Sequence, residues 1–216
     1  MNEYLKAQNK TNEAVIAGFF RTDELDRFSR SDFRWADNRK KPFQFRTIKK
    51  GEIYQFEFGK NYMPEMSYEH RGLVIGVKKK LLYVLPIFSY SSVKHPDVYH
   101  PVDFPNSKSD LFLLKGQDFS FLTHNSVLKL NDIRTVSINR ILYRYTGRVD
   151  LSSDTYKQIE SLVFHKYFPE IHNELVKMDT AITELEADKK KLAEEITSLT
   201  KENEKLKEEL KSLRRK

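Results

Sequence analysis

The chain has 216 residues, 39% hydrophobic and 32% charged, which suits one compact domain plus an extension. Its 15 Phe and 11 Tyr can fill a core, so a wholly disordered chain is excluded. It has no cysteine, which excludes disulfides, thiolate zinc sites and cysteine nucleophiles. The net charge of +7 lies within residues 1–170, because residues 171–216 carry 11 basic and 11 acidic side chains. A basic globular part favours an anionic partner such as nucleic acid, with a merely soluble basic surface as the alternative.

The apolar segments of the chain are short. The longest, Leu81–Phe88, is far below the roughly 20 residues that span a bilayer. The opening residues, MNEYLKAQNK, lack the apolar region of a signal peptide. We therefore expect a cytoplasmic protein with no membrane partner.

Residues 1–47 form a polar leader that could be helical around Asn12–Arg27. Its second half alternates Arg and Lys with aromatic residues, namely Phe28, Phe33, Trp35, Phe43 and Phe45. Such a pattern can stack bases and bind phosphates. The interpretation that we favour is that these aromatic side chains pack on the body of the protein.

Residues 48–170 read as short strands followed by one helix. Gly51–Phe58 alternates apolar and polar residues, and the apolar runs Gly72–Val77 and Leu81–Leu85 flank Lys78–Lys80 as a hairpin. Further strands are expected at Asp110–Leu114, Ser126–Leu130 and Arg134–Val136. A helix capped by Ser152, Ser153 or Asp154 follows and ends near Pro169. Several short strands with turns between them favour a small, mainly β barrel or sandwich.

Residues 171–216 carry a heptad repeat. The d positions are Leu185, Leu192, Leu199, Leu206 and Leu213, and the a positions are Ile182, Lys189, Ile196, Asn203 and Leu210. In a parallel pair, Glu202 faces Lys207 and Glu209 faces Arg214, while Asn203 favours two strands in one register. The pattern therefore predicts a homodimer through a parallel coiled coil; a solvated single helix or one folded back on its own domain is the alternative.

Several catalytic motifs are missing from the chain. It contains no phosphate-binding GxxxxGK[ST], no Gly-rich dinucleotide turn, no HExxH and no GxSxG. The six histidines show no tight metal-ligand spacing. We expect no metal and no cofactor.

Three segments, in the same order and at the same spacing, resemble the PemK/MazF family of toxin endoribonucleases over about residues 48–168. They are Gly51–Phe58 with the strand start His70–Ile75, the segment Asn125–Val136, and Gly147–Asp150 with the helix that follows. The resemblance implies an SH3-like barrel with an appended helix. It also implies cleavage of single-stranded RNA without a metal, and control by an antitoxin.

The resemblance assigns the main active-site arginine to Arg71, which would stabilise the charged phosphorane. The family's second residue, a threonine, corresponds to Phe88, so Ser89 would serve by a shift of one residue. A basic and an acidic position of some members fall on Lys129 and Asn131. Asparagine cannot act as a base at neutral pH.

The proton acceptor stays open at this point. Loop candidates for a base or a substrate contact are His70, His95, His100 and Asp103. Candidate RNA contacts are Lys129, Asn131 and the hairpin lysines Lys78, Lys79 and Lys80.

Two classes of function follow from the sequence. The first is a toxin-type endoribonuclease of a toxin–antitoxin or abortive-infection system that cleaves RNA by 2′-hydroxyl attack. The alternative is a catalytically inactive PemK/MazF-like module that binds nucleic acid or protein and assembles through its coiled coil. A purely structural coiled-coil adaptor would leave the basic β domain unexplained.

Overall fold

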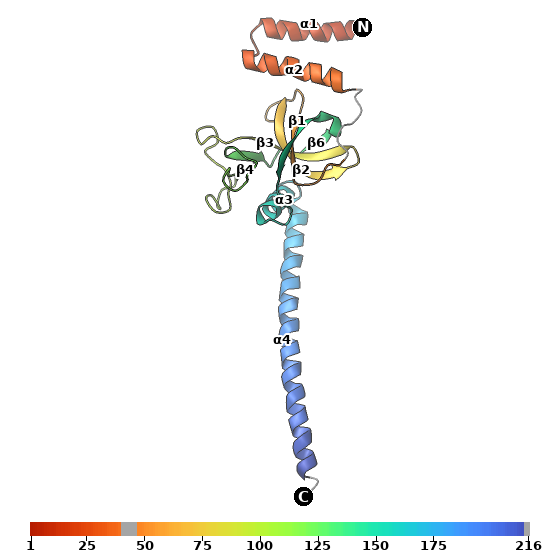
Figure 1. Cartoon of the computed structure of the whole chain (residues 1–216), viewed down its shortest axis with the longest axis vertical. Helices are drawn as coiled ribbons and strands as arrows, with labels where there is room; N and C mark the ends of the chain where they lie inside the picture. The colour runs from red at the N-terminus through yellow and green to blue at the C-terminus, as the bar shows by residue number, and fades with distance from the viewer. Residues whose placement is uncertain (40–46, 214–216) are drawn as a thin grey trace. The chain divides into compact units, whose positions relative to one another are not determined.

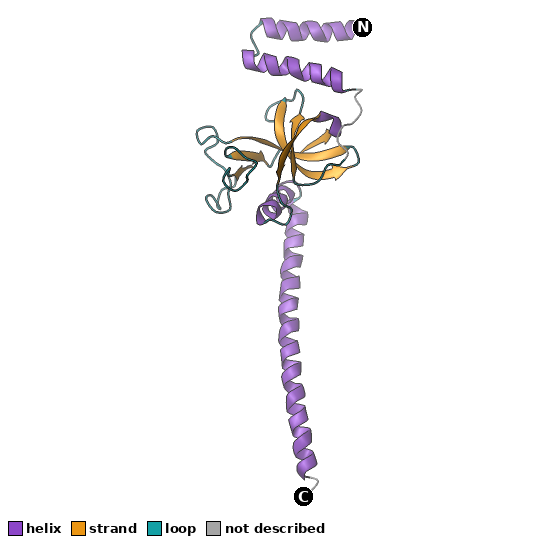
Figure 2. Cartoon of the chain, viewed as in Figure 1, coloured by secondary structure: helices purple, strands orange, loops and turns teal. Residues whose placement is uncertain are grey.

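The computed structural model describes residues 1–39 and 47–213. Their contacts divide the chain into two compact units, Met1–Lys166 and Tyr167–Lys216. Two helices, an antiparallel sheet and most of a third helix make up the first unit, and a single long helix makes up the second (Figures 1 and 2).

The sheet contains seven described strands. They are β1 (Glu52–Glu57), β2 (Glu69–Lys78), β3 (Leu81–Ser89), β4 (Leu111–Leu114), β5 (Ser126–Lys129), β6 (Arg134–Ser137) and β7 (Ile141–Arg148). Their order is β4-β5-β3-β2-β1-β7, with β6 also paired to β3. A short 3-10 helix, Ile138–Arg140, separates β6 from β7. Among these strands no pairing joins β4 to β7, so the sheet is open and the expected barrel stays a prediction.

Strand β3 organises the sheet. One of its edges pairs with β2, forming the predicted hairpin around Lys79 and Lys80. Its other edge pairs first with β6 and then, from Ile87 to Ser89, with β5. The end of β3 therefore lies between the start of β2 and the start of β5, although these segments are far apart in the sequence.

The two faces of the sheet bury separate apolar clusters because side chains alternate along each strand. The first cluster joins Ile53, Leu73 and Ile87 to Tyr156 and Ile159 of helix α3 (Asp154–Tyr167). The second joins Tyr54, Phe56, Val74, Val84 and their neighbours on the opposite face. Helix α3 therefore covers the face that carries Leu73.

The predicted start and end of helix α3 are confirmed. The Ser153 hydroxyl accepts a hydrogen bond from the Tyr156 amide at 3.2 Å, as an N-cap residue does. The helix ends at Tyr167, and the next helix, α4, begins at Pro169. Proline is tolerated there because the first turn of a helix lacks partners for its amides.

The leader contains two helices, α1 (Asn2–Ile16) and α2 (Thr22–Asn38). The expected helix around Asn12–Arg27 was wrong in its bounds, because Gly18, with φ +74°, lies in the break between them. Phe28 packs beneath Lys60, but Phe33 and Trp35 are 75% and 63% exposed. Packing on the body therefore holds for Phe28 and not for the other two, while Phe43 and Phe45 lie outside the described residues.

Helix α4 (Pro169–Leu213) has no buried residue. Its apolar a and d side chains are between 51% and 69% exposed, and the pattern extends back through Met178 and Leu175 to Ile171. At 1.5 Å per residue the helix is about 68 Å long. None of the described helices is long and apolar enough to cross a membrane. Arg214 lies outside the described residues, and the coiled coil stays a prediction.

Candidate active site

Strand register brings Arg71, Ser89 and Ser126 together. Arg71 lies opposite Ile87 in the β2–β3 pair, and Ser89, two residues further along β3, lies opposite Ser126 of β5. Residues directly opposite each other in an antiparallel pair point to the same face, as do residues two apart in one strand. All three side chains therefore lie on the face covered further along by α3, just beyond Leu73.

The Arg71 guanidinium is held from two directions. Its Nη2 donates to the Oγ of Ser126 at 3.2 Å and to Nε2 of His124 at 3.4 Å. The ring of Tyr145 lies 5.9 Å from its central carbon, a cation–π distance. Ser126 is fully buried, whereas Arg71 is half-buried, so the guanidinium is fixed at its base and still reaches the surface.

His124 lies in the loop before β5 and is exposed. Ser89 Oγ lies 2.9 Å from its Nε2, and Thr123 Oγ1 lies 2.9 Å from its Nδ1. Because a guanidinium can only donate, the contact with Arg71 makes Nε2 the acceptor and Nδ1 the protonated nitrogen. Thr123 then accepts from Nδ1, and the basic nitrogen faces Arg71 and Ser89.

The loop that carries His124 is fixed by its neighbour Asn125. The Asn125 side-chain oxygen accepts from the Gly116 amide at 2.9 Å, and its carbonyl accepts from the Tyr90 amide at 3.0 Å. These bonds hold both sides of the segment between β4 and β5. His124 is therefore positioned by backbone contacts and not by its own side chain alone.

Tyr145 of β7 closes the site on the side away from His124. Burial, together with the hydrogen-bonded Tyr143 hydroxyl 3.2 Å away, raises the pKa of Tyr145 to about 12. Its hydroxyl donates to Gln55 at 3.4 Å. Tyr145 therefore stays a neutral phenol at physiological pH and offers Arg71 an uncharged aromatic wall.

The arrangement combines a fixed cation, an accessible basic nitrogen and a hydroxyl. A guanidinium can bind and neutralise a phosphate, and a neutral imidazole can remove a proton. Ser89, which is exposed, can donate a hydrogen bond to a phosphate oxygen. Such a set is suited to an anionic ester that approaches from solvent.

Strand alternation also accounts for Phe88. It points away from Arg71 and packs on a third apolar cluster formed by Val98, Leu113 and Val127. The neighbouring Ser89 takes the position next to the arginine. The one-residue shift expected from the sequence therefore has a structural basis, while the role of Ser89 stays a prediction.

The structure does not bring the four candidate bases to Arg71. His70 alternates with Arg71 and lies opposite Phe56, on the other face of the sheet. Burial, reinforced by the nearby charge of Arg27, lowers the pKa of His70 below its usual value. His70 is therefore neutral at physiological pH and directed away from the guanidinium.

His95, His100 and Asp103 belong to the long segment between β3 and β4. His95 accepts from the Ser91 amide and packs on Phe88, and the buried His100 accepts from two amides of its own turn. Asp103 pairs with Lys115, whose hydrogen bond lowers the pKa of that carboxyl. These side chains organise the segment through their described contacts.

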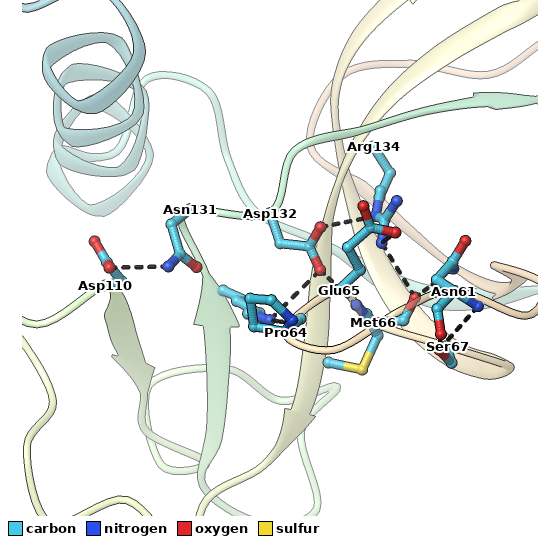
Figure 3. Close-up of polar contacts among 10 residues, drawn as sticks. Asn61, Pro64, Glu65, Met66, Ser67, Asp110, Asn131, Asp132 and Arg134 are labelled. Atoms are coloured by element: carbon cyan, nitrogen blue, oxygen red, sulfur yellow. Dashed lines mark hydrogen bonds and ion pairs between the residues drawn. The ribbon is translucent and has the colours of Figure 1, made fainter.

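Lys129 and Asn131 lie at the other end of β5, in a polar network around the loop between β1 and β2 (Figure 3). Lys129 donates to the Pro64 carbonyl, and Asn131 donates to Asp110 at 2.9 Å. Asp132, 8% exposed, accepts from the Met66 amide at 2.7 Å. Both predicted RNA contacts are thus engaged within the chain.

Arg134 completes this network. It pairs with Asp132 at 2.7 Å and Glu65 at 3.1 Å, and it donates to the Met66 carbonyl at 3.4 Å. The loop is therefore fastened to the β5–β6 turn. Lys78, Lys79 and Lys80 are exposed at the tip of the β2–β3 hairpin.

Sequence reasoning missed His124, Thr123, Ser126 and Tyr145. The available signal was weak: His124 lies two residues before Ser126, in the segment that resembled the toxin family. Among residues 1–39 and 47–213, no group of three or more His, Asp or Glu side chains could hold a metal ion. No protein-family model and no curated protein matches this chain.

Proposed function

We propose that the chain is an endoribonuclease that cleaves single-stranded RNA through attack of the 2′-hydroxyl on the adjacent phosphate, without a metal. The observation that carries this proposal is the contact of His124 Nε2 with both Arg71 and Ser89 at an exposed end of the sheet. The positive charge of the body, which lies within residues 1–170, supports an anionic substrate.

The chemistry needs a base, a stabiliser of the phosphorane and a proton for the leaving oxygen. In the proposal, His124 Nε2 accepts the 2′-hydroxyl proton as that oxygen attacks phosphorus. Arg71 and Ser89 hydrogen-bond the phosphate oxygens as charge develops on them. The bond to the 5′-oxygen breaks, that oxygen takes a proton from solvent, and a 2′,3′-cyclic phosphate remains.

The proposal includes a PemK/MazF-like identity, with the sheet and α3 as an SH3-like barrel and its appended helix. The hairpin of β2 and β3, the position of Arg71 at the start of β2 and the capped helix after β7 support it. It also includes a toxin role held in check by an antitoxin in the cytoplasm.

The toxin proposal is tested by expressing the intact chain and its Arg71→Ala variant in growing cells. We expect only the intact chain to arrest growth and to produce RNA ends that share a short sequence. Arg21→Ala is the matched control, because Arg21 is an exposed arginine paired with Asp23. Equal harm from all three chains, or none, contradicts the proposal and favours a binding module.

The proposed assembly is a homodimer through a parallel coiled coil of α4. The exposed seam runs along the whole helix from Ile171 to Leu213, and an isolated helix has no other means of burying it. A second copy fits it best, because Asn203 at an a position pairs with itself, and Glu202 and Lys207 match across a parallel pair.

The dimer is tested by replacing both Leu192 and Leu199 with Asp. Two charges in the seam should give a monomer, or a markedly weaker dimer, in analytical ultracentrifugation. Replacing Glu194 and Lys201, outside the seam, with Gln is the control and should leave the mass unchanged. A variant that keeps the wild-type dimer mass contradicts the coiled-coil assignment.

A further inference from the structure

Helix α2 and the sheet enclose a cavity of about 530 Å³ that is separate from the contacts of Arg71. Its walls come from the second half of α2, the end of β1 with Gly59 and Lys60, and the 3-10 helix before β7. Pockets for small ligands commonly have volumes of about 300–1,000 Å³. The cavity is therefore large enough for one nucleotide.

Trp35 provides an aromatic surface in this cavity. It is the single tryptophan of the chain and is 63% exposed, which is unusual for so large an apolar ring. The guanidinium of Arg39 lies 5.3 Å from the centre of its ring. An exposed indole beside a cation is suited to stacking a base and contacting its phosphate.

The charges of the cavity favour an anion. Four cations and two carboxylates line it. Both carboxylates have partners, because Glu57 pairs with Arg34 at 3.1 Å and Asp32 pairs with Lys60 at 2.6 Å. Arg39 and Arg140 supply the positive excess, and Arg140 is held against the Glu57 carbonyl by a 2.9 Å hydrogen bond.

The same contacts relate the cavity to the candidate active site. Arg34 also pairs with Glu69 at 2.6 Å, so α2 is anchored on the face of β1 and β2 that carries Arg71. Glu69 and Arg71 are two residues apart, about 7 Å along the strand. A single strand of RNA seated against α2 can therefore continue toward Arg71.

From these observations we infer that the cavity binds one nucleotide of single-stranded RNA, with its base stacked on Trp35 and its phosphate on Arg39 and Arg140. The inference rests on the proposed function for the identity of the strand as RNA. It gives the leader a role in substrate binding, outside the segment that resembles the toxin family. Stacking of one base is worth about fivefold to a hundredfold in affinity.

The test uses tryptophan emission, because Trp35 is the only fluorophore of its kind in the chain. The full-length Arg71→Ala variant is titrated with a labelled 2′-O-methyl oligonucleotide, which lacks the attacking hydroxyl. We expect saturable quenching that parallels binding measured by anisotropy. Binding without any change in emission overturns the inference.

Substitutions then locate the contact. Trp35→Leu should weaken binding about tenfold, and Arg39→Gln several-fold, as measured by anisotropy. Phe33→Leu is the matched control, since Phe33 is also exposed but lies about 200° around α2 from Trp35. Equal affinities of the Trp35 and Phe33 variants overturn the inference.

Two further arms separate it from other outcomes. Free AMP or UMP that quenches as strongly as the oligonucleotide, at the same concentration, means a site for free nucleotides and overturns a strand-binding role. Quenching by the oligonucleotide in a protein that cleaves no RNA supports the cavity while contradicting the proposed nuclease.

Discussion

Strand β5 is only four residues long, yet a polar cluster lies at each of its ends. At its start, Arg71, Ser89 and His124 gather around Ser126, and two of them are exposed. At its end, Asp132 and Arg134 bind the loop between β1 and β2 and are shielded by it. The difference indicates separate roles: the first cluster leaves groups accessible to a substrate, while the second satisfies its groups within the chain.

The largest expected effect comes from His124→Ala. Removing the base should slow cleavage about a thousandfold, within the range for a general base. The free energy of unfolding should change by less than about 0.5 kcal/mol, because His124 is exposed. Cleavage rates with a fluorescent RNA and urea unfolding measure the two effects. His95→Ala is the control, and a His124→Ala rate within threefold of it would refute the assigned base.

Asp132→Ala should do the reverse. It leaves the Met66 amide and Arg134 without their carboxylate, so we expect a loss of about 2 kcal/mol in the free energy of unfolding. The cleavage rate of the folded protein should change little. Asp118→Ala, at an exposed position, is the control. A large loss of rate at unchanged stability would place this network in the chemistry.

Ser153→Ala tests a stabilising contact far from both clusters. Losing the N-cap of α3 should cost about 1 kcal/mol in urea unfolding. Ser153→Asp should recover most of the loss, because a carboxylate also caps a helix. Failure of the aspartate to recover it would mean that the contact does not act as a cap.

The smallest effect concerns pH. The pKa of His70 is lowered in the folded state by burial, so below about pH 6.5 the unfolded chain binds more protons. Stability should therefore be unaffected above that pH and decrease as the pH falls below it. His70→Gln should reduce this slope in unfolding measured between pH 5 and 7.5; an unchanged slope would contradict the assignment.

Local patterns predicted much of the fold. Alternation located β1, the apolar runs located the β2–β3 hairpin, and Ser153 and Pro169 marked helix boundaries. Strand β7 was not predicted, because two shifts of register with β1 interrupt its pattern. The break at Gly18 also divided what had been read as one leader helix.

The candidate site was only half accessible from the sequence. Arg71 and Ser89 followed from a resemblance, but His124 did not, because its approach depends on β5 pairing with the end of β3. That pairing is a long-range contact with no local signal. The same holds for Tyr145, which reaches Arg71 through the pairing of β7 with β1.

The most direct measurement uses purified full-length protein and a short RNA containing one mapped cleavage site. A matched RNA carries a single 2′-deoxy nucleotide immediately 5′ of the scissile phosphate. We predict that the first is cut to a 2′,3′-cyclic phosphate, that the second stays intact, and that Arg71→Ala cuts neither. Cleavage of the deoxy-substituted strand, or undiminished cleavage by the Arg71 variant, would contradict the mechanism.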